Sequence, residues 1–198
     1  MNTEPKRIDN GSLGRIDRRM LVLGMFVLLA VPGQALAHTA RRKFVLEERF
    51  LPQNVRSPYD YPAGTIVVVP REKYLYLVGG AGSARRYGIG VGKAGLAFTG
   101  SAVIGRKAKW PSWRPTDNMI RRDPDRYGPY AGGLPGGLGN PLGARALYIG
   151  GSLYRIHGTN QPWTIGQNVS SGCIRMRNED VIELYNRVGV GTKVVVIR

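Results

Sequence analysis

The stretch "IHGTNQPWTIGQNVSSGCIRM", Ile156 to Met176, holds one of two histidines and the only cysteine among 198 residues. A single cysteine cannot form an intramolecular disulfide. Cys173 therefore serves in packing, in metal binding, in an intermolecular disulfide or in chemistry. One cysteine and one histidine are too few for a structural zinc site, which takes four ligands. The remaining uses have to be separated by the rest of the sequence.

A cysteine becomes a nucleophile when a nearby base or charge holds it as the thiolate. His38 directly follows an expected cleavage site and should be remote, which leaves His157 as the candidate base. His157 ends a predicted strand and is followed by Gly158, whereas Gly172 precedes Cys173, where backbone amides suit an oxyanion. The residues alone leave buried packing open as well, because single cysteines are often core filler.

Residues 1–37 have the pattern of a secretory signal. A charged start is followed by the eleven-residue apolar run 21–31 and by Ala35-Leu36-Ala37, after which we expect cleavage. That run is too short to span a bilayer, which takes about 20 residues. Arg18-Arg19 weakly resembles a twin-arginine signal, but such pairs are common in ordinary signals, so we favour the general secretory route. We expect an exported protein of the periplasm or cell envelope.

The basic charge narrows the class of partner. After residue 37, 161 residues remain, with 24 basic and 10 acidic side chains and a net charge of +14. A positive net charge of this size is typical of proteins that bind nucleic acid. Export argues against that and favours anionic envelope polymers, lipid headgroups or simply a well-solvated basic surface. In an oxidising compartment, a single cysteine also means that the core, not disulfides, stabilises the chain.

The length suits one domain, which we expect at 64–198 behind a basic, proline-punctuated N-terminal extension at 38–63. Many short strands between turn signals predict a mainly β sandwich or barrel. The first two strands should form a hairpin, and the glycines in the third indicate a bend or a close backbone approach. The expected strands are 65–69, 74–78, 85–92, 102–106, 146–149, 154–157 and 193–197.

Two further segments stand out. A short helix is predicted after the cysteine, with Asn178 as its cap and Gly189 at its end. Residues 111–145 contain six prolines and seven glycines. A long irregular segment of this kind is a functional lid or disorder. Its aromatic residues, which include Trp113 and Tyr130, favour a packed lid.

The spacing between His157 and Cys173 resembles the signature of the L,D-transpeptidase (YkuD-type) family of bacterial cell-wall enzymes. That signature is a His-Gly pair, a spacer, and Ser-x-Gly-Cys with an arginine two residues on, here Arg175. The family often has histidine where this chain has Ser171, which leaves the base at His157 unchanged but bears on how strongly the thiolate is held. Similarity extends over about 65–197 and includes the stretches 110–119 and 140–149.

The resemblance implies a mainly β catalytic domain that uses no metal or organic cofactor. Cys173 would attack the bond between the third residue of a peptidoglycan stem, diaminopimelate, and the following D-Ala. His157 would act as general base, oriented by a carbonyl near Gly158, and amides around Gly172 would hold the oxyanion. An amine of a second stem or of a lipoprotein would resolve the thioester. Carbapenem β-lactams are the implied covalent inhibitors.

Several roles stay open. Arg175 would either grip a stem carboxylate or buttress the loop, and Ser171 is a second candidate for substrate contact. Trp113 and Tyr130 would line the groove or pack beneath the lid. An L,D-carboxypeptidase that hydrolyses the same bond is an alternative, because the choice of acceptor depends on how well water is excluded. A non-catalytic wall-binding module that uses the basic charge is another.

Overall fold

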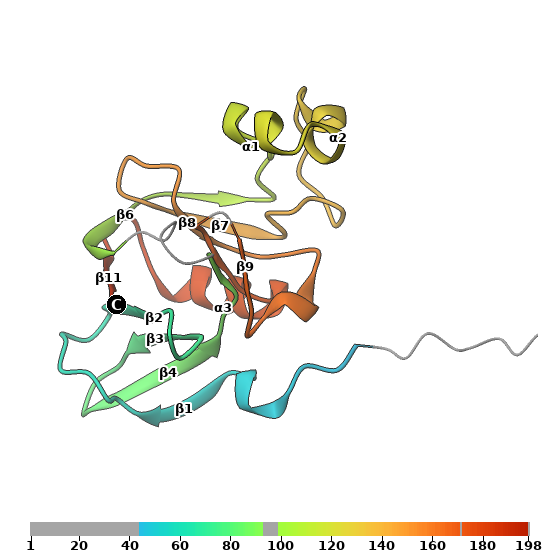
Figure 1. Ribbon diagram of the computed structural model, residues 1–198. Helices are drawn as coiled ribbons and strands as arrows, with labels where there is room; N and C mark the ends of the chain where they lie inside the picture. The colour runs from blue at the N-terminus through green and yellow to red at the C-terminus, as the bar shows by residue number, and fades with distance from the viewer. Residues whose placement is uncertain (1–43, 93–98, 171, 198) are drawn as a thin grey trace, which may run out of the picture. The chain divides into compact units, whose positions relative to one another are not determined.

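The computed structural model describes residues 44–92, 99–170 and 172–197 (Figure 1). The expected signal at 1–37, the histidine at position 38 and Ser171 lie outside these residues. Within the described part of the chain, no helix is both long and apolar enough to cross a membrane.

Most of the described strands belong to one nine-stranded sheet, which does not close into a barrel. In spatial order its strands are β1 (Gln53–Arg56), β4 (Ser83–Gly88), β3 (Tyr74–Val78), β2 (Ile66–Val69), β11 (Lys193–Val196), β6 (Gly100–Lys109), β7 (Arg145–Ile149), β8 (Arg155–His157) and β10 (Ile174–Arg175). The predicted hairpin is confirmed as the antiparallel pair β2–β3. Two short strands, β5 (Val91–Gly92) and β9 (Asn168–Ser170), form a separate parallel pair.

The centre of the sheet is apolar on both faces. All four residues of β2 are buried, and the strand pairs in parallel with β11 and antiparallel with β3. A continuous run of β-branched residues is typical of a strand covered on both sides. Full burial of each such side chain contributes about 1.5–3 kcal/mol. Residues from 55–61, within the expected N-terminal extension, pack against one of these faces.

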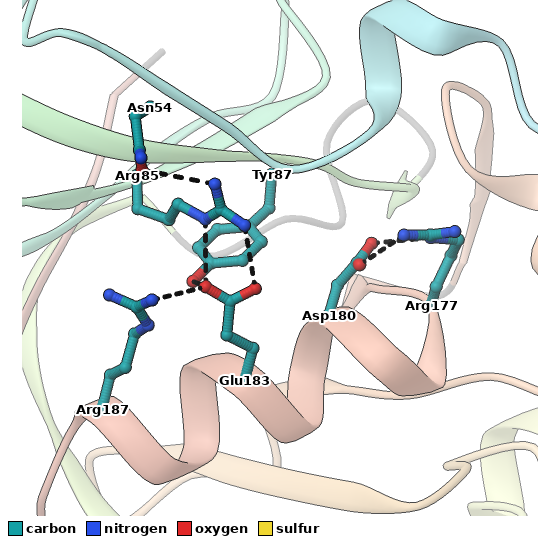
Figure 2. A network of polar contacts seen from close by, with 7 residues as sticks. All are labelled: Asn54, Arg85, Tyr87, Arg177, Asp180, Glu183 and Arg187. Atoms are coloured by element: carbon teal, nitrogen blue, oxygen red, sulfur yellow. Dashed lines mark hydrogen bonds and ion pairs between the residues drawn. The ribbon is translucent and has the colours of Figure 1, made fainter.

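The helix α3 (Asn178–Arg187) packs against β7 and β8 and buries Val181 and Leu184 in the main core. Its polar side is tied to β4 through Glu183, which pairs with Arg85 at 3.0 Å and with Arg187 at 2.9 Å (Figure 2). Burial alone would raise the pKa of Glu183, but the bonds and charges of the two arginines hold that pKa below its usual value. The network fixes the helix that follows the cysteine.

The segment 111–145 is more regular than its composition indicates. It contains α1 (Asp117–Arg122) and α2 (Pro124–Tyr127), which lie together in Figure 1, followed by the 3-10 turn Gly128–Tyr130. Thr116 and Asp123 cap the two helices, since each side chain accepts a hydrogen bond from the backbone N–H three residues on. The chain leaves the sheet at the end of β6 and returns at β7.

Candidate active site

The site is built on the parallel pair β8–β10. In this pair Ile156 lies opposite Ile174, and His157 lies opposite Arg175. Both isoleucines are buried in the core. Because successive side chains alternate between the faces of a strand, His157 and Arg175 point to the other face.

Arg155 is the first residue of β8 and Cys173 immediately precedes β10, so each stands two residues before its member of the pair His157–Arg175. Four side chains therefore share one face of the sheet. His157 and Cys173 occupy one diagonal of this array, and Arg155 and Arg175 occupy the other. Diagonal neighbours in a sheet lie close enough for long or aromatic side chains to reach each other. The array thus has His157 at the end of β8 and Cys173 directly before the neighbouring strand β10.

The four side chains of the array line a cleft of about 1170 Å³. One wall is the expected lid, which contributes Trp113 and Tyr130 among other residues. Their rings pack edge to face at 6.1 Å, so the two residues contact each other as well as lining the cleft. The exposed side chains of Leu153 and Trp163 also line the cleft.

His157 is held in one orientation. Its Nδ1 lies 2.5 Å from the carbonyl oxygen of Gly158, which is the carbonyl expected to orient the ring. A carbonyl only accepts, so Nδ1 carries the proton and Nε2 is left as a basic lone pair. Burial of the ring lowers the pKa of His157 to about 3, and the charges of Arg175 and Arg155 act in the same direction. The imidazole is therefore neutral at pH 7.

The low pKa of His157 predicts how the free energy of unfolding depends on pH. In the unfolded chain a histidine titrates near 6.5, so between about pH 6.5 and 3 the unfolded state binds the proton and the folded state does not. The stabilisation linked to His157 is complete above pH 6.5 and is lost as the pH falls toward 3, by up to about 1.4 kcal/mol per pH unit. Urea unfolding of His157→Gln and wild type from pH 7.5 to 4 should give free energies that converge on acidification.

The control is His38→Gln, which removes the only other histidine. Its free energy of unfolding should depend on pH as that of wild type does. Parallel curves for His157→Gln and wild type would contradict the low pKa of the buried ring.

The loop before Cys173 depends on two glycines. Gly172 has a φ of 123°, a conformation that favours glycine. A Cβ atom added at Gly92 would lie 2.6 Å from the Cα of Gly172, so β5 approaches this loop with no room for a side chain. Gly90 next to it exchanges two backbone hydrogen bonds with Arg175, at 2.9 and 2.7 Å. The predicted close backbone approach is therefore one between the 90–92 segment and the cysteine loop.

Cys173 itself is half-buried, and its Sγ lies 3.8 Å from the carbonyl oxygen of Leu153. That carbonyl also accepts a hydrogen bond from Nε of Arg155 at 2.9 Å. The turn before β8 thus contacts both the thiol and the neighbouring guanidinium. Within the described residues, no three His, Cys, Asp or Glu side chains gather where they would hold a metal ion.

The predicted helix cap at Asn178 is wrong. Arg177 occupies the cap position without a capping side-chain hydrogen bond, and Asn178 is the first helical residue. The Oδ1 atom of Asn178 instead accepts a hydrogen bond from the N–H of Ala144 at 2.9 Å. A side chain at position 158 would clash with the same oxygen, because a Cβ atom on Gly158 would overlap it. Asn178 therefore anchors the start of β7 beside the carbonyl that orients His157.

Comparisons with known proteins identify the family of this chain. The model of the YkuD family, the L,D-transpeptidase catalytic domain, matches residues 63–196. The chain belongs to this family. The probable L,D-transpeptidase ErfK/SrfK of Escherichia coli strain K12 is 38% identical over 149 residues, which cover 74% of this chain and 48% of that protein. The probable L,D-transpeptidase YcfS of the same strain is 33% identical and covers 96% and 59%.

The chain spans about half the length of the curated L,D-transpeptidases it matches. A crystal structure from Brucella melitensis, named a probable carnitine operon oxidoreductase, is 52% identical with a TM-score of 0.52 and covers 77% of this chain and 96% of that one. The Ldtfm–avibactam carbamoyl enzyme is 19% identical with a TM-score of 0.54 and covers 70% and 50%. That likeness is one of fold, and the predicted mainly β class is confirmed.

Three residues of the site were placed by the structure rather than by the sequence pattern. These are Arg155, Gly92 and Leu153. Arg155 stands two residues before His157 in a predicted strand, so strand alternation is a signal that would have found it. The glycines of 85–92 predicted a close backbone approach, but the partner of Gly92 and the contact of Leu153 lie in distant parts of the chain and have no local signal.

Proposed function

We propose that this chain is a cell-wall L,D-transpeptidase in which Cys173 is the nucleophile. One observation carries the proposal: Cys173 and His157 line the same cleft, and Nδ1 of His157 is bonded to the Gly158 carbonyl. The free Nε2 of a neutral imidazole is the form that accepts a proton from a thiol. Both residues line a single cleft large enough for a peptide.

The reaction then runs in two halves. His157 takes the thiol proton as Sγ of Cys173 bonds to the carbonyl carbon between diaminopimelate and D-Ala. Backbone amides near Gly172 hold the oxyanion. When the tetrahedral intermediate collapses, its C–N bond breaks, the proton on His157 passes to the leaving D-Ala nitrogen, and a thioester remains. An acceptor amine attacks the thioester, transfers its proton through His157 and regenerates the thiol.

The two arginines bear on the timing of proton transfer. Because burial and the charges of Arg175 and Arg155 disfavour a positive charge on His157, we expect the imidazolium to form only while negative charge develops on sulfur and oxygen. The histidine is thus suited to act during the chemical step rather than to sit in a resting thiolate–imidazolium pair. General-base catalysis of this kind typically contributes about 10²- to 10⁴-fold.

The deciding experiment is incubation with disaccharide tetrapeptides, followed by separation and mass analysis of the products. Cross-linked dimers formed with release of D-Ala support the transpeptidase. Tripeptides without dimers would identify an L,D-carboxypeptidase instead. Binding to the wall without any release of D-Ala, and identical behaviour of Cys173→Ala, would identify a binding module.

We also propose that the protein works outside the cytoplasm. The support is the signal pattern of residues 1–37 and the substrate class, since stem peptides are assembled into wall in the envelope. Mass analysis of the envelope fraction should find a mature chain that starts at His38. Uncleaved protein confined to the cytosol would overturn this part of the proposal.

A further inference from the structure

The cleft carries more positive charge than the chemistry of His157 and Cys173 requires. The residues that line it include Arg126, Arg155 and Arg175, and none of the lining residues is an aspartate or glutamate. Two of these arginines occupy the second diagonal of the four-residue array. An uncompensated cationic wall beside the reacting atoms is a feature that an anionic ligand would complete.

Of Arg155 and Arg175, Arg175 has the less complete set of side-chain hydrogen bonds. Its Nε is buried and has no hydrogen-bond partner among the described residues. Its Nη1 has only a long contact of 3.5 Å with Oε1 of Gln161. Burial lowers the pKa of Arg175, as expected for a charge removed from water. Leaving a buried donor unpaired is costly, so an incoming carboxylate gains a charge-assisted bond while it removes this cost.

Arg155 is in a different position. Its Nε donates to the carbonyl of Leu153 at 2.9 Å, and its guanidinium lies over the ring of Tyr148 at 5.5 Å. It stands two residues before His157 in β8, not opposite it. Both arginines carry the same charge, but of these two only Arg175 has a buried Nε without a hydrogen-bond partner among the described residues.

The proposed reaction determines which carboxylate reaches Arg175. The leaving nitrogen receives its proton from His157, so the D-Ala residue that carries this nitrogen lies on the His157 side of the array. Its terminal carboxylate is separated from that nitrogen by a single Cα atom. Arg175 is the direct cross-strand neighbour of His157. We propose that Arg175 binds the terminal carboxylate of the leaving D-Ala and thereby selects donors whose stem ends at that residue.

This inference rests on the proposed function, and its main test uses two donors. A tetrapeptide with a free terminal carboxylate is compared with the same peptide ending in a carboxamide. Wild type should prefer the acid in kcat/KM by about 10- to 100-fold, the range expected for hydrogen bonds to charged groups. Arg175→Gln should lose this preference, and Arg175→Lys should restore part of it. Arg155→Gln, which removes an equal charge, should keep it.

Two outcomes would overturn the inference: a wild-type preference that survives in Arg175→Gln, or an equal loss of the preference in Arg155→Gln and Arg175→Gln. An arginine that only buttresses the loop would lower kcat/KM for both donors by the same factor. The ratio between donors is therefore the readout that a purely structural role does not move.

A second measurement does not need turnover. Alkylation of Cys173 by iodoacetate, an anion, is compared with alkylation by neutral iodoacetamide. The ratio of the two rates should fall several-fold in Arg175→Gln and stay unchanged in Arg71→Gln, which removes a charge from an exposed turn. An unchanged ratio in Arg175→Gln would reject the anion site. If wild type alkylates with the expected ratio but converts no muropeptide, the proposed function fails and the anion site stands.

Discussion

Replacing Cys173 by alanine is expected to abolish release of D-Ala from the tetrapeptide donor, down to the rate of the reaction without enzyme. The thiol forms the acyl bond in the proposed mechanism, and no second cysteine exists in the chain to replace it. The measurement is D-Ala release by wild type and variant at equal concentration. Because the side chain is half-buried and small, the variant should keep its fold.

A thermal unfolding curve and donor binding by calorimetry are the controls. Both should be close to wild type, which separates loss of chemistry from loss of structure. A folded Cys173→Ala variant that still releases D-Ala at a substantial fraction of the wild-type rate would show that the nucleophile lies elsewhere.

Replacing His157 by alanine is expected to slow acylation by a factor on the order of 100 or more, as loss of a general base typically does. The thiol would then lose its proton only to solvent, from a cleft in which His157 is the one histidine. Single-turnover acylation, followed by quenched mass analysis, measures this step directly.

The variant His157→Gln offers a matched test, because its amide has a donor for the carbonyl of Gly158 but no basic nitrogen. It should be as slow as His157→Ala while retaining more stability at neutral pH. Faster acylation of His157→Gln, within about tenfold of wild type, would mean that the ring only positions the loop.

The strands that sequence patterns predict are those with apolar alternation or apolar runs. The hairpin of β2 and β3 follows from two such runs separated by a turn. In contrast, β1 reads "QNVR" and β10 has two residues, so neither has a local signal. Their pairing depends on partners far along the chain: β1 with β4, and β10 with β8.

The same distinction holds in the site. The single cysteine and the remaining histidine are predictable because the chain offers no other candidates, and the resemblance gives them roles. Strand alternation puts Arg155 on the same face as His157. The parallel pairing of β8 with β10, which brings Arg175 beside His157, has no local signal in the sequence. Asn178 is of a residue type that suits a helix cap, but its side chain instead accepts a hydrogen bond from the N–H of Ala144, far along the chain.

The segment 111–145 shows how composition misleads. Its prolines and glycines predict irregular chain, yet Thr116 and Asp123 each supply a cap, and Pro124 occupies the first turn of a helix where its missing N–H costs nothing. Two short helices result, and they support the aromatic wall of the cleft. The prediction that this segment is packed rested on its aromatic residues, and the ring of Trp113 does contact the rings of Tyr127 and Tyr130.

The central claim is that Cys173 is a nucleophile beside an oxyanion site and a neutral histidine. A strained β-lactam carbonyl should be opened by such a thiol and retained as a thioester, as the family resemblance implies for carbapenems. Ser171 should not prevent the reaction, since His157 supplies the proton transfer.

The most direct measurement is therefore intact-mass analysis of the purified protein after incubation with a carbapenem, with peptide mapping of the adduct. We expect one adduct per chain, located on Cys173 and absent from Cys173→Ala. A folded wild-type protein that converts muropeptides but forms no adduct, or forms it on another residue, would contradict the account.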